Sequence, residues 1–564
     1  MTTLAREAAG RPATGSTLEP ALKDAPPNPR DWNVILASSA GTIFEWYDFF
    51  LAGSLAAHLA DAFMPGADGD ARFALVLVGF AIGFAVRPLG ALVFGRLGDR
   101  VGRKRSFLLT IVVMGLATIA MGLLPGYATI GPAAPALFIV CRLLQGLALG
   151  GEYGGAITYV AEHAPPGRRG LHTSFIQTNA TLGLFLSLAV VLWLRLVLSP
   201  EAFAAWGWRV PFLLSALLLL VSVWIRLRLG ETPVFQRMEA EGAIARAPLR
   251  EAFGRWTNIK RALLALCATM GQAVVWYTGQ FYALFFLTQV LGVASATADL
   301  LMALALFAGM PFFLLFGWLS DRIGRKPVLL VGLAAAALAY FPLFAQLAHL
   351  ANPKLDAAIQ KTKVVVSADP ATCGHLFDPS GVHAFSTPCD VVRRALAAQP
   401  IRYELAAAPP GAPLAATVNG RPVPDPTAAA VVAAAQAAGY PRADDPTILH
   451  APTLGAVLRD PRARQAWAVL FALVVLVTAV YGPIAALLAE LFPTRIRYTG
   501  VSLPYHVGNG WFGGFLPPVS FAAIAATGNI LSGLWYPVLV AALAFVLGWA
   551  CLPETADRDL HAVE

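Results

Sequence analysis

Long apolar runs separated by short polar turns dominate the sequence. A helix needs about 20 mostly apolar residues to cross a bilayer, and runs of about that length occur in two sets. The first set occupies residues 32–59, 73–94, 107–124, 135–160, 171–194 and 210–229. The second set occupies residues 263–290, 300–319, 328–350, 466–491, 501–526 and 534–552. The pattern therefore predicts an all-α membrane protein with twelve transmembrane helices.

A ten-residue polar turn occurs twice and relates the two sets. The segment 95–104 reads Gly-Arg-Leu-Gly-Asp-Arg-Val-Gly-Arg-Lys, and 317–326 reads Gly-Trp-Leu-Ser-Asp-Arg-Ile-Gly-Arg-Lys. The second copy follows the first by 222 residues (317 − 95). Repeats at a fixed offset mark equivalent points of homologous units, so we expect the helices to form two pseudo-symmetric six-helix bundles.

A second repeated motif places an insertion in the later half. Glu-His-Ala-Pro at 162–165 is echoed by Glu-Leu-Phe-Pro at 490–493, an offset of 328 (490 − 162). The difference from the first offset is 106 residues (328 − 222). These extra residues lie within a polar stretch rich in Ala and Pro at 351–462, between the predicted ninth and tenth helices. A segment of this length inside a compact protein is either functional or partly disordered.

Lys and Arg indicate the orientation in the membrane. Basic residues are retained in cytoplasmic loops, and here they gather in alternate loops: 96–105, 168–169, 226–261, 322–326 and 495–497. We therefore expect cytoplasmic termini and an extracytoplasmic insert. The predicted parts are tails at 1–31 and 553–564, bundles at 32–229 and 263–552, a cytoplasmic linker at 230–262 and the insert at 351–462.

Composition supports a membrane protein and excludes other classes. The chain is 57% hydrophobic and 13% charged, with a mean hydropathy of +0.64. The net charge of +8 comes from short turns rather than from a basic face interleaved with aromatics, so we expect no nucleic-acid partner. No nucleophile, metal cluster or cofactor loop stands outside the spans, which predicts that the protein is not an enzyme and binds neither metal nor cofactor. Cys373 and Cys389 fall in the insert, where an oxidising compartment favours a disulfide over two free thiols or a metal pair.

The repeated Gly-x-x-x-Asp-Arg-x-Gly-Arg-Lys turns, after the second and eighth spans, resemble the signature of the major facilitator superfamily. Four further segments resemble its metabolite:proton symporter family: 44–49 (Phe-Glu-Trp-Tyr-Asp-Phe), 87–90 (Arg-Pro-Leu-Gly), 142–146 (Arg-Leu-Leu-Gln-Gly) and 150–152 (Gly-Gly-Glu). That family includes carriers for citrate, α-ketoglutarate, shikimate and proline or betaine. The resemblance implies a transporter of the bacterial inner membrane that works by alternating access, with a small solute, protons and membrane lipid as partners. We expect a monomer.

Two carboxyl groups in the first span are candidates for proton coupling. Glu45 and Asp48 are three residues apart and share one helix face. Two carboxylates this close in a low-dielectric medium cannot both ionise cheaply, so at least one is expected to carry a proton. Proton-coupled sugar carriers of the superfamily pair a first-span Asp with a fourth-span Arg, and this resemblance pairs Asp48 with Arg142. The alternatives are a static ion pair and, for Glu45, a hydrogen bond to a neighbouring helix.

A small organic acid is the expected solute, because Arg87 and Arg142 can neutralise a carboxylate; alternatively, Arg87 pairs with Glu152. Polar and aromatic side chains of the first, seventh and eleventh spans are expected to line the site: Trp46, Tyr47, Gln272, Trp276, Tyr277, Gln280, His506 and Asn509. The runner-up solute is a zwitterionic osmolyte such as proline or betaine, enclosed by aromatic rings. A third possibility is a transporter-like sensor that signals through its insert.

The repeated turns are also expected to form a cytoplasmic gate. Asp99 can face helix N-termini where the halves meet, and Arg103 can reach Glu162. The second copy would do the same with Glu490. The predicted gate residues are Asp99, Arg100, Arg103, Glu162, Asp321, Arg322, Arg325 and Glu490.

Overall fold

The computed structural model describes residues 29–63, 82–228, 230–373, 386–442, 444–558 and 560. The first half forms six membrane-crossing helices. They are α2 (Pro29–Ser54) with α3 (Ala56–Phe63), α5 (Arg87–Val101), α6 (Arg103–Leu123), α8 (Ala133–His163), α9 (Arg169–Val197) and α11 (Val210–Leu227). Short helices α7 (Tyr127–Ile130), α10 (Pro200–Ala205) and η1 (Gly207–Arg209) join them at one end. Residues 73–81 of the predicted second span lie outside the described residues.

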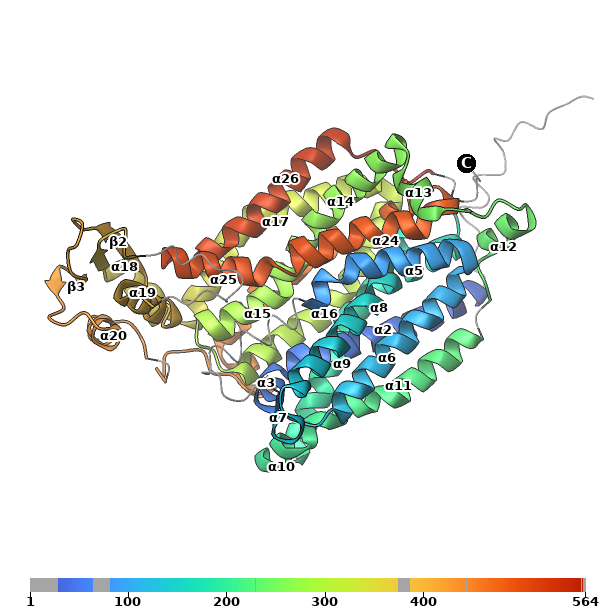
Figure 1. Ribbon diagram of the computed structural model, residues 1–564. Coiled ribbons are helices and arrows are strands. Elements are labelled where there is room, and N and C mark those ends of the chain that lie inside the picture. The colour runs from blue at the N-terminus through green and yellow to red at the C-terminus, as the bar shows by residue number, and fades with distance from the viewer. Residues whose placement is uncertain are drawn as a thin grey trace, which may run out of the picture.

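The second half repeats this arrangement. Its helices are α14 (Trp256–Tyr277) continued by η2 (Thr278–Tyr282), α15 (Ala283–Phe285) and η3 (Phe286–Val290), then α16 (Ser295–Ile323), α17 (Arg325–Ala351), α22 (Pro461–Tyr481) with α23 (Ile484–Leu491), α24 (Arg497–Val507) with η5 (Gly508–Gly513) and α25 (Leu516–Thr527), and α26 (Trp535–Cys551). Short elements η4 (Thr494–Ile496) and η6 (Ser532–Leu534) precede α24 and α26. The linker carries α12 (Pro233–Ala240) and α13 (Pro248–Phe253). The blue-to-green and the yellow-to-red helices lie side by side as two bundles (Figure 1).

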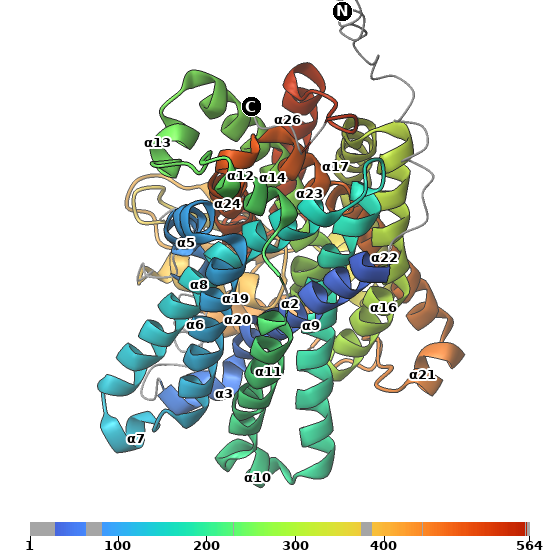
Figure 2. The same ribbon diagram turned by 90° about the vertical axis from the view of Figure 1, so that its right-hand side faces the viewer.

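The twelve-helix prediction is confirmed, although the helices differ in character. Nine helices in the described part of the chain are long and apolar enough to cross a membrane. Among the other three, α2 contains Glu45 and Asp48, which lower its mean hydropathy, and the eleventh helix changes to η5 and is interrupted at 514–515. These irregular helices, with the seventh, supply most of the candidate site. Figures 1 and 2 place α12, α13 and the C-terminal end of α26 together, away from α7 and α10.

Each repeated turn is a sharp corner made possible by glycine. Gly102 separates α5 from α6 with a φ of 117°, and Gly324 separates α16 from α17 with a φ of 100°. Only glycine adopts such angles without strain. Each corner is capped by a distant carboxylate: Glu231 accepts hydrogen bonds from the first backbone amides of α6, and Glu554 does the same for α17. Burial raises the pKa of Glu554, but its four backbone donors outweigh burial and leave that pKa below its usual value.

The insert is a folded α/β unit. It comprises α18 (Pro353–Lys361), β1 (Val364–Ala368), α19 (Pro388–Ala398), β2 (Tyr403–Ala407), β3 (Ala415–Val418), β4 (Arg421–Pro422), α20 (Ala428–Ala437) and α21 (Leu454–Arg459). The strand order is β2-β1-β3-β4, with β1 parallel to β2 and the other pairs antiparallel. Buried Val366, Leu396 and Val431 belong to a hydrophobic core that continues into the second bundle. The described part of the insert is therefore ordered, rather than a loop without structure.

The insert sits at the end of the bundles away from α12, α13 and the C-terminal end of α26 (Figure 1). Described residues of the insert make polar contacts with the second bundle. The Tyr403 hydroxyl donates to the carbonyl of Ala525 in α25 at 2.7 Å, and the Asn352 amide donates to Leu291 at 3.0 Å. These contacts attach the insert to the second six-helix unit.

A disulfide joins Cys373 and Cys389, with the two Cα atoms 5.4 Å apart. We expect its loss to destabilise the insert by about 3 kcal/mol, because a bridge that closes a loop of about 15 residues restricts the unfolded chain by that amount. The test is the rate of thermolysin cleavage within the insert of the full-length Cys373→Ser/Cys389→Ser protein. Cys551→Ser, which removes an exposed free thiol, is the matched control. Equal cleavage of the two variants would contradict the prediction.

Candidate functional site

Aromatic side chains fill the seam between the two bundles. The rings of Trp46 and Phe50 on α2 lie 6.3 Å and 6.4 Å from the ring of Trp276 on α14, measured between centroids. Nearer the repeated turns, Tyr153 of α8 stacks on Tyr505 of α24 at 3.4 Å. The predicted aromatic residues thus come from different halves and meet where alternating access would place a solute.

Arg87 lies in this seam and is only 1% exposed. Its guanidinium carbon stands 4.0 Å from the ring centroid of Phe84 and 4.5 Å from that of Phe49. Its Nε and Nη2 have no hydrogen-bond partner. Among the described residues, no ion pair joins Arg87 to Glu152, so the alternative pairing is not formed. A buried cation with unsatisfied donors is costly, and an anionic ligand would relieve that cost.

Polar groups of the second bundle lie near the seam. Gln272 of α14 and Asn509 of η5 exchange amide hydrogen bonds of 3.1 Å and 3.5 Å. Gln280 and His506 are buried, and neither their amide atoms nor their ring nitrogens have hydrogen-bond partners in the described structure. Tyr47 differs, because its hydroxyl donates to the Pro211 carbonyl at 2.9 Å inside the first bundle. Tyr47 therefore packs in that bundle rather than lining the seam.

Asp48 and Arg142 are linked indirectly. The expected direct ion pair is absent among the described residues. Arg142 donates to Gln145 at 2.6 Å, and the Gln145 amide donates to the Thr118 hydroxyl at 2.8 Å. That hydroxyl also faces Asp48. The contact differs from the expectation because one turn of α8 and a residue of α6 stand between the two charged groups.

Asp48 has a second hydroxyl contact within the first bundle. Asp48 accepts a hydrogen bond of 2.5 Å from Ser215 of α11. Asp48 is 5% exposed, and its carboxyl group is held by hydroxyl groups instead of a cation. A proton on this carboxyl group would neutralise it.

Glu45 contacts Arg226, the first residue of the basic loop 226–261 that the sequence indicates. Arg226 at the end of α11 lies 3.3 Å from the Glu45 carboxylate. The carboxyl group of Glu152 on α8 faces the same pair. The sequence does not indicate that these side chains are close together. The three residues lie on separate helices, and only packing determines how each helix is rotated about its axis.

The first repeated turn contacts the opposite bundle. Asp99 accepts hydrogen bonds from the backbone amides of Tyr498 and Thr499, at 3.3 Å and 2.9 Å. These are the second and third residues of α24, where free N–H groups and the helix dipole favour a carboxylate. Arg103 pairs with Asp99 at 2.7 Å and approaches Glu162 at 3.9 Å.

The second turn makes the equivalent contacts in the reverse direction. Asp321 accepts hydrogen bonds of 2.8 Å from the second and third amides of α9, those of Gly170 and Leu171. Arg325 pairs with Asp321 at 2.7 Å and with Glu490 at 3.1 Å. Each half therefore caps a helix of the other.

Two arginines complete these networks and were missed from the sequence. Arg497 pairs with Glu162 at 2.8 Å, and Arg169 lies 3.9 Å from Glu490. The offset of 328 that relates the two glutamates also relates these arginines (497 − 169), and this signal could have identified them. Arg100 and Arg322 are exposed and stand outside the networks formed by the described residues.

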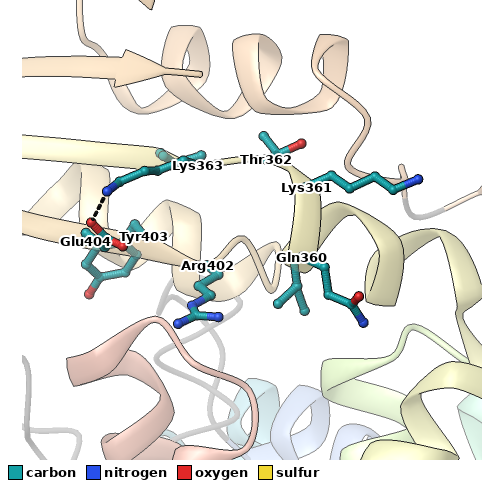
Figure 3. A pocket seen from close by; sticks show the side chains of 9 residues that line it. Gln360, Lys361, Thr362, Lys363, Arg402, Tyr403 and Glu404 are labelled. Carbon is teal, nitrogen blue, oxygen red and sulfur yellow. Dashed lines mark ion pairs between the residues drawn. The ribbon is translucent and has the colours of Figure 1, made fainter. Parts of the chain in front are cut away.

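The insert contains a separate hollow of about 210 Å³. Its lining comes from the end of α18, the start of β1 and the start of β2, and Lys363 pairs with Glu404 there at 2.8 Å (Figure 3). Small-molecule sites in proteins usually occupy about 300–1,000 Å³. This hollow is smaller than that range. The seam is the candidate solute site because buried polar atoms of Arg87, Gln280 and His506 lack partners there among the described residues.

Comparisons with known proteins agree with the fold. The family model of the Major Facilitator Superfamily matches residues 39–351. The α-ketoglutarate permease of Escherichia coli K12 is 36% identical over 324 residues, covering 57% of this chain and 73% of the permease. The shikimate transporter of the same strain is 36% identical over 317 residues, covering 55% and 71%. The proline/betaine transporter of Escherichia coli K12 is 35% identical over 321 residues, covering 55% of this chain and 63% of that transporter.

A solved structure of the proton:xylose symporter XylE, bound to 6-bromo-6-deoxy-D-glucose, superposes with a TM-score of 0.60. The alignment covers 94% of this chain and 98% of XylE at 16% identity. A double Trp mutant of XylE gives a TM-score of 0.62 over the same shares. At this identity the likeness establishes the fold.

We expect Asp99→Asn to weaken the contact with α24 by about 1 kcal/mol, because the neutral amide loses the attraction of the carboxylate to the N-terminus of that helix. The population with the bundles parted at this end should rise about fivefold. The measurement is the rate of maleimide labelling of Ser502→Cys, a buried seam position, in a Cys551→Ser background. Asp425→Asn in the insert is exposed and serves as the control. Unchanged labelling, or loss of solute binding alone, would argue against a gate.

Proposed function

The chain belongs to the Major Facilitator Superfamily of membrane transporters, and from this premise we propose that it imports a small organic acid together with protons. The bundles rock about the seam and expose it to each side of the membrane in turn. The protein works as a monomer in lipid, in a bacterial inner membrane, with both termini in the cytoplasm and the insert outside. The basic turns at 96–105 and 322–326 support this orientation.

The observation that carries the proposal is the buried, unsatisfied guanidinium of Arg87. A carboxylate can accept two parallel hydrogen bonds from such a group and cancel its charge. The surrounding rings of Phe49, Phe84 and Trp46 exclude water, which strengthens the contact. Tyr277 of the second bundle faces Arg87 as well. A solute bound here therefore touches both bundles, as a solute that drives their closure must.

Proton coupling follows from the hydrogen-bonded chain between Arg142 and Asp48. A carboxylate of the solute, either the one bound to Arg87 or a second one, attracts the Arg142 side chain. The hydrogen bonds from Arg142 to Gln145 and from Gln145 to Thr118 then change. Because the Thr118 hydroxyl also faces Asp48, this change alters the surroundings of the Asp48 carboxyl group. In a buried site lined by hydroxyl groups, that carboxyl group is more stable when protonated. Solute and proton then bind together and are released together. The gradient across a bacterial inner membrane drives protons inward, which makes the carrier an importer.

A zwitterionic osmolyte is the second candidate. Trp46, Phe50 and Trp276 present three ring systems within 6.4 Å of one another, and aromatic faces attract quaternary ammonium groups. The proline/betaine transporter among the relatives supports this alternative. Betaine would still place its carboxylate at Arg87, so the two candidates differ in what the rings enclose.

Replacing Arg87 tests the carboxylate anchor. We expect Arg87→Gln to weaken solute binding 10- to 100-fold, since a hydrogen bond to a charged group is worth about 1.5–3 kcal/mol. Proteoliposome uptake of labelled α-ketoglutarate, shikimate, citrate and glycine betaine identifies the solute, and its KM reports the loss. Arg228→Gln changes an exposed arginine in the same way and should behave like the unmodified protein. Equal KM values for the two variants would exclude Arg87 as the anchor.

Replacing Asp48 tests the coupling route. We expect Asp48→Asn to abolish the stimulation of uptake by an inward pH gradient, because asparagine cannot bind or release the proton. Binding of the solute, measured by thermal stabilisation of the purified protein, should persist. Uptake that stays equally dependent on the gradient would remove Asp48 from the proton route.

A further inference from the structure

Three charged side chains inside the first bundle form a closed cluster: Glu45 on α2, Glu152 on α8 and Arg226 on α11. They are 4%, 1% and 1% exposed. Arg226 stands 3.3 Å from Glu45, and the two carboxyl groups face each other. None of the four carboxyl oxygens has a hydrogen bond of good geometry in the described structure, and the Thr42 hydroxyl faces Glu152. One guanidinium cannot balance two carboxylates, so the ionised cluster holds one excess negative charge.

We propose that this cluster is a proton-binding site of the transporter, in which Glu45 and Glu152 share one proton beside Arg226. This rests on the proton-coupled transport proposed above and adds a second site to it. One bound proton makes the cluster neutral and supplies the hydrogen-bond donor that its oxygens lack. Two carboxyl groups in a low-dielectric site readily share a single proton in this way.

The cluster is a built site rather than an accidental meeting. A Cβ atom at Gly41 would stand 2.7 Å from Nε and Nη2 of Arg226, so only glycine lets the guanidinium lie against α2. The opposite face of Arg226 stacks on the Phe107 ring at 3.2 Å, and Nη1 donates to the Phe107 carbonyl at 3.0 Å. Helices α2 and α6 thus hold the base between them while α8 presents the second acid.

Other charged and titratable groups approach the cluster from each neighbouring helix. Asp48 follows Glu45 on α2, and Arg87 of α5 lies on the Glu152 side. Tyr159 of α8 and Tyr498 of α24 face Arg226. Helix α9 packs on α2 through Gly183, which touches Trp46 and Tyr47. The tyrosines are neutral donors, so the proton balance depends on the carboxyl groups and the arginines.

Tyr498 connects the cluster to the contacts between the bundles. Its hydroxyl donates to the carbonyl of Gly151 at 2.7 Å, one residue before Glu152. Its ring packs against Gly98 and Gly155, and its backbone amide is held by Asp99. While the bundles are joined at this end, Tyr498 covers the cluster. When α24 moves away, the cover leaves and the cluster can release its proton to that side.

The experiment measures how proton binding shifts the conformation of the full-length protein. Spin labels at Val101→Cys and Ile323→Cys, both exposed and in different bundles, report the distance across the inner end. Both substitutions are made in a Cys551→Ser background. The distance distribution is recorded in lipid nanodiscs from about pH 5 to about pH 9. Glu152→Gln and Glu45→Gln mimic the protonated acid, and Glu241→Gln is the exposed matched control.

We expect the unmodified protein and Glu241→Gln to shift with pH, and both cluster variants to shift less, because only Asp48 still takes up a proton in them. Thermal unfolding within a few degrees of the parent, together with retained counterflow of the solute that the uptake screen identifies, excludes misfolding. Counterflow needs no net proton movement, so a cluster locked in its protonated form still supports it. A Glu152→Gln protein that shifts with pH like the parent overturns the proposal.

The controls separate this inference from the proposed function. If Asp48→Asn abolishes the shift and the cluster variants keep it, proton coupling stands and the cluster has no part in it. If the unmodified protein shows no shift and no uptake responds to a pH gradient, proton-coupled transport itself is wrong.

Discussion

Charged side chains inside a membrane protein have to be neutralised locally, because the surrounding medium screens them poorly. The first bundle contains several such groups, and each has a different solution. Asp48 is held by hydroxyl groups, Glu45 shares Arg226 with Glu152, and Arg87 stacks on rings with donors left unsatisfied. The second bundle presents amides and aromatic rings to the seam instead. The charged groups of the seam thus belong to the first half, whereas the second half contributes neutral polar and aromatic groups.

The ends of the helices follow the same constraint. Free backbone amides at the starts of α9 and α24 carry partial positive charge, and each is met by an aspartate of the opposite bundle. Because the caps cross the interface, parting the bundles exposes them to water rather than to lipid. The helix ends exchange hydrogen bonds to protein for hydrogen bonds to water when the bundles part. This exchange keeps the joined and parted arrangements close in energy, which a reversible carrier requires.

Much of the fold could be predicted from the sequence. Apolar runs gave the helices, and two repeated motifs gave the duplication and the position of the insert. The expected direct pair of Asp48 and Arg142 is not formed in this structure, because depth along two helices does not determine which side chains stand between them. Here Gln145 and Thr118 stand between the two charged groups. The cluster at Arg226 depends on the rotation of three helices about their axes, which only packing fixes. The sheet of the insert has short strands and could not be recognised from its composition.

The crossed caps also bear on how the chain arose. Asp99 holds the fifth helix of the second half, and Asp321 holds the fifth helix of the first. These are one contact repeated by a two-fold rotation, as in the interface of a symmetric dimer. An ancestral half with a single signature turn would satisfy both caps only by associating with a second copy of itself. The duplication then preserved, within one polypeptide, an interface that had to be self-complementary before the halves diverged.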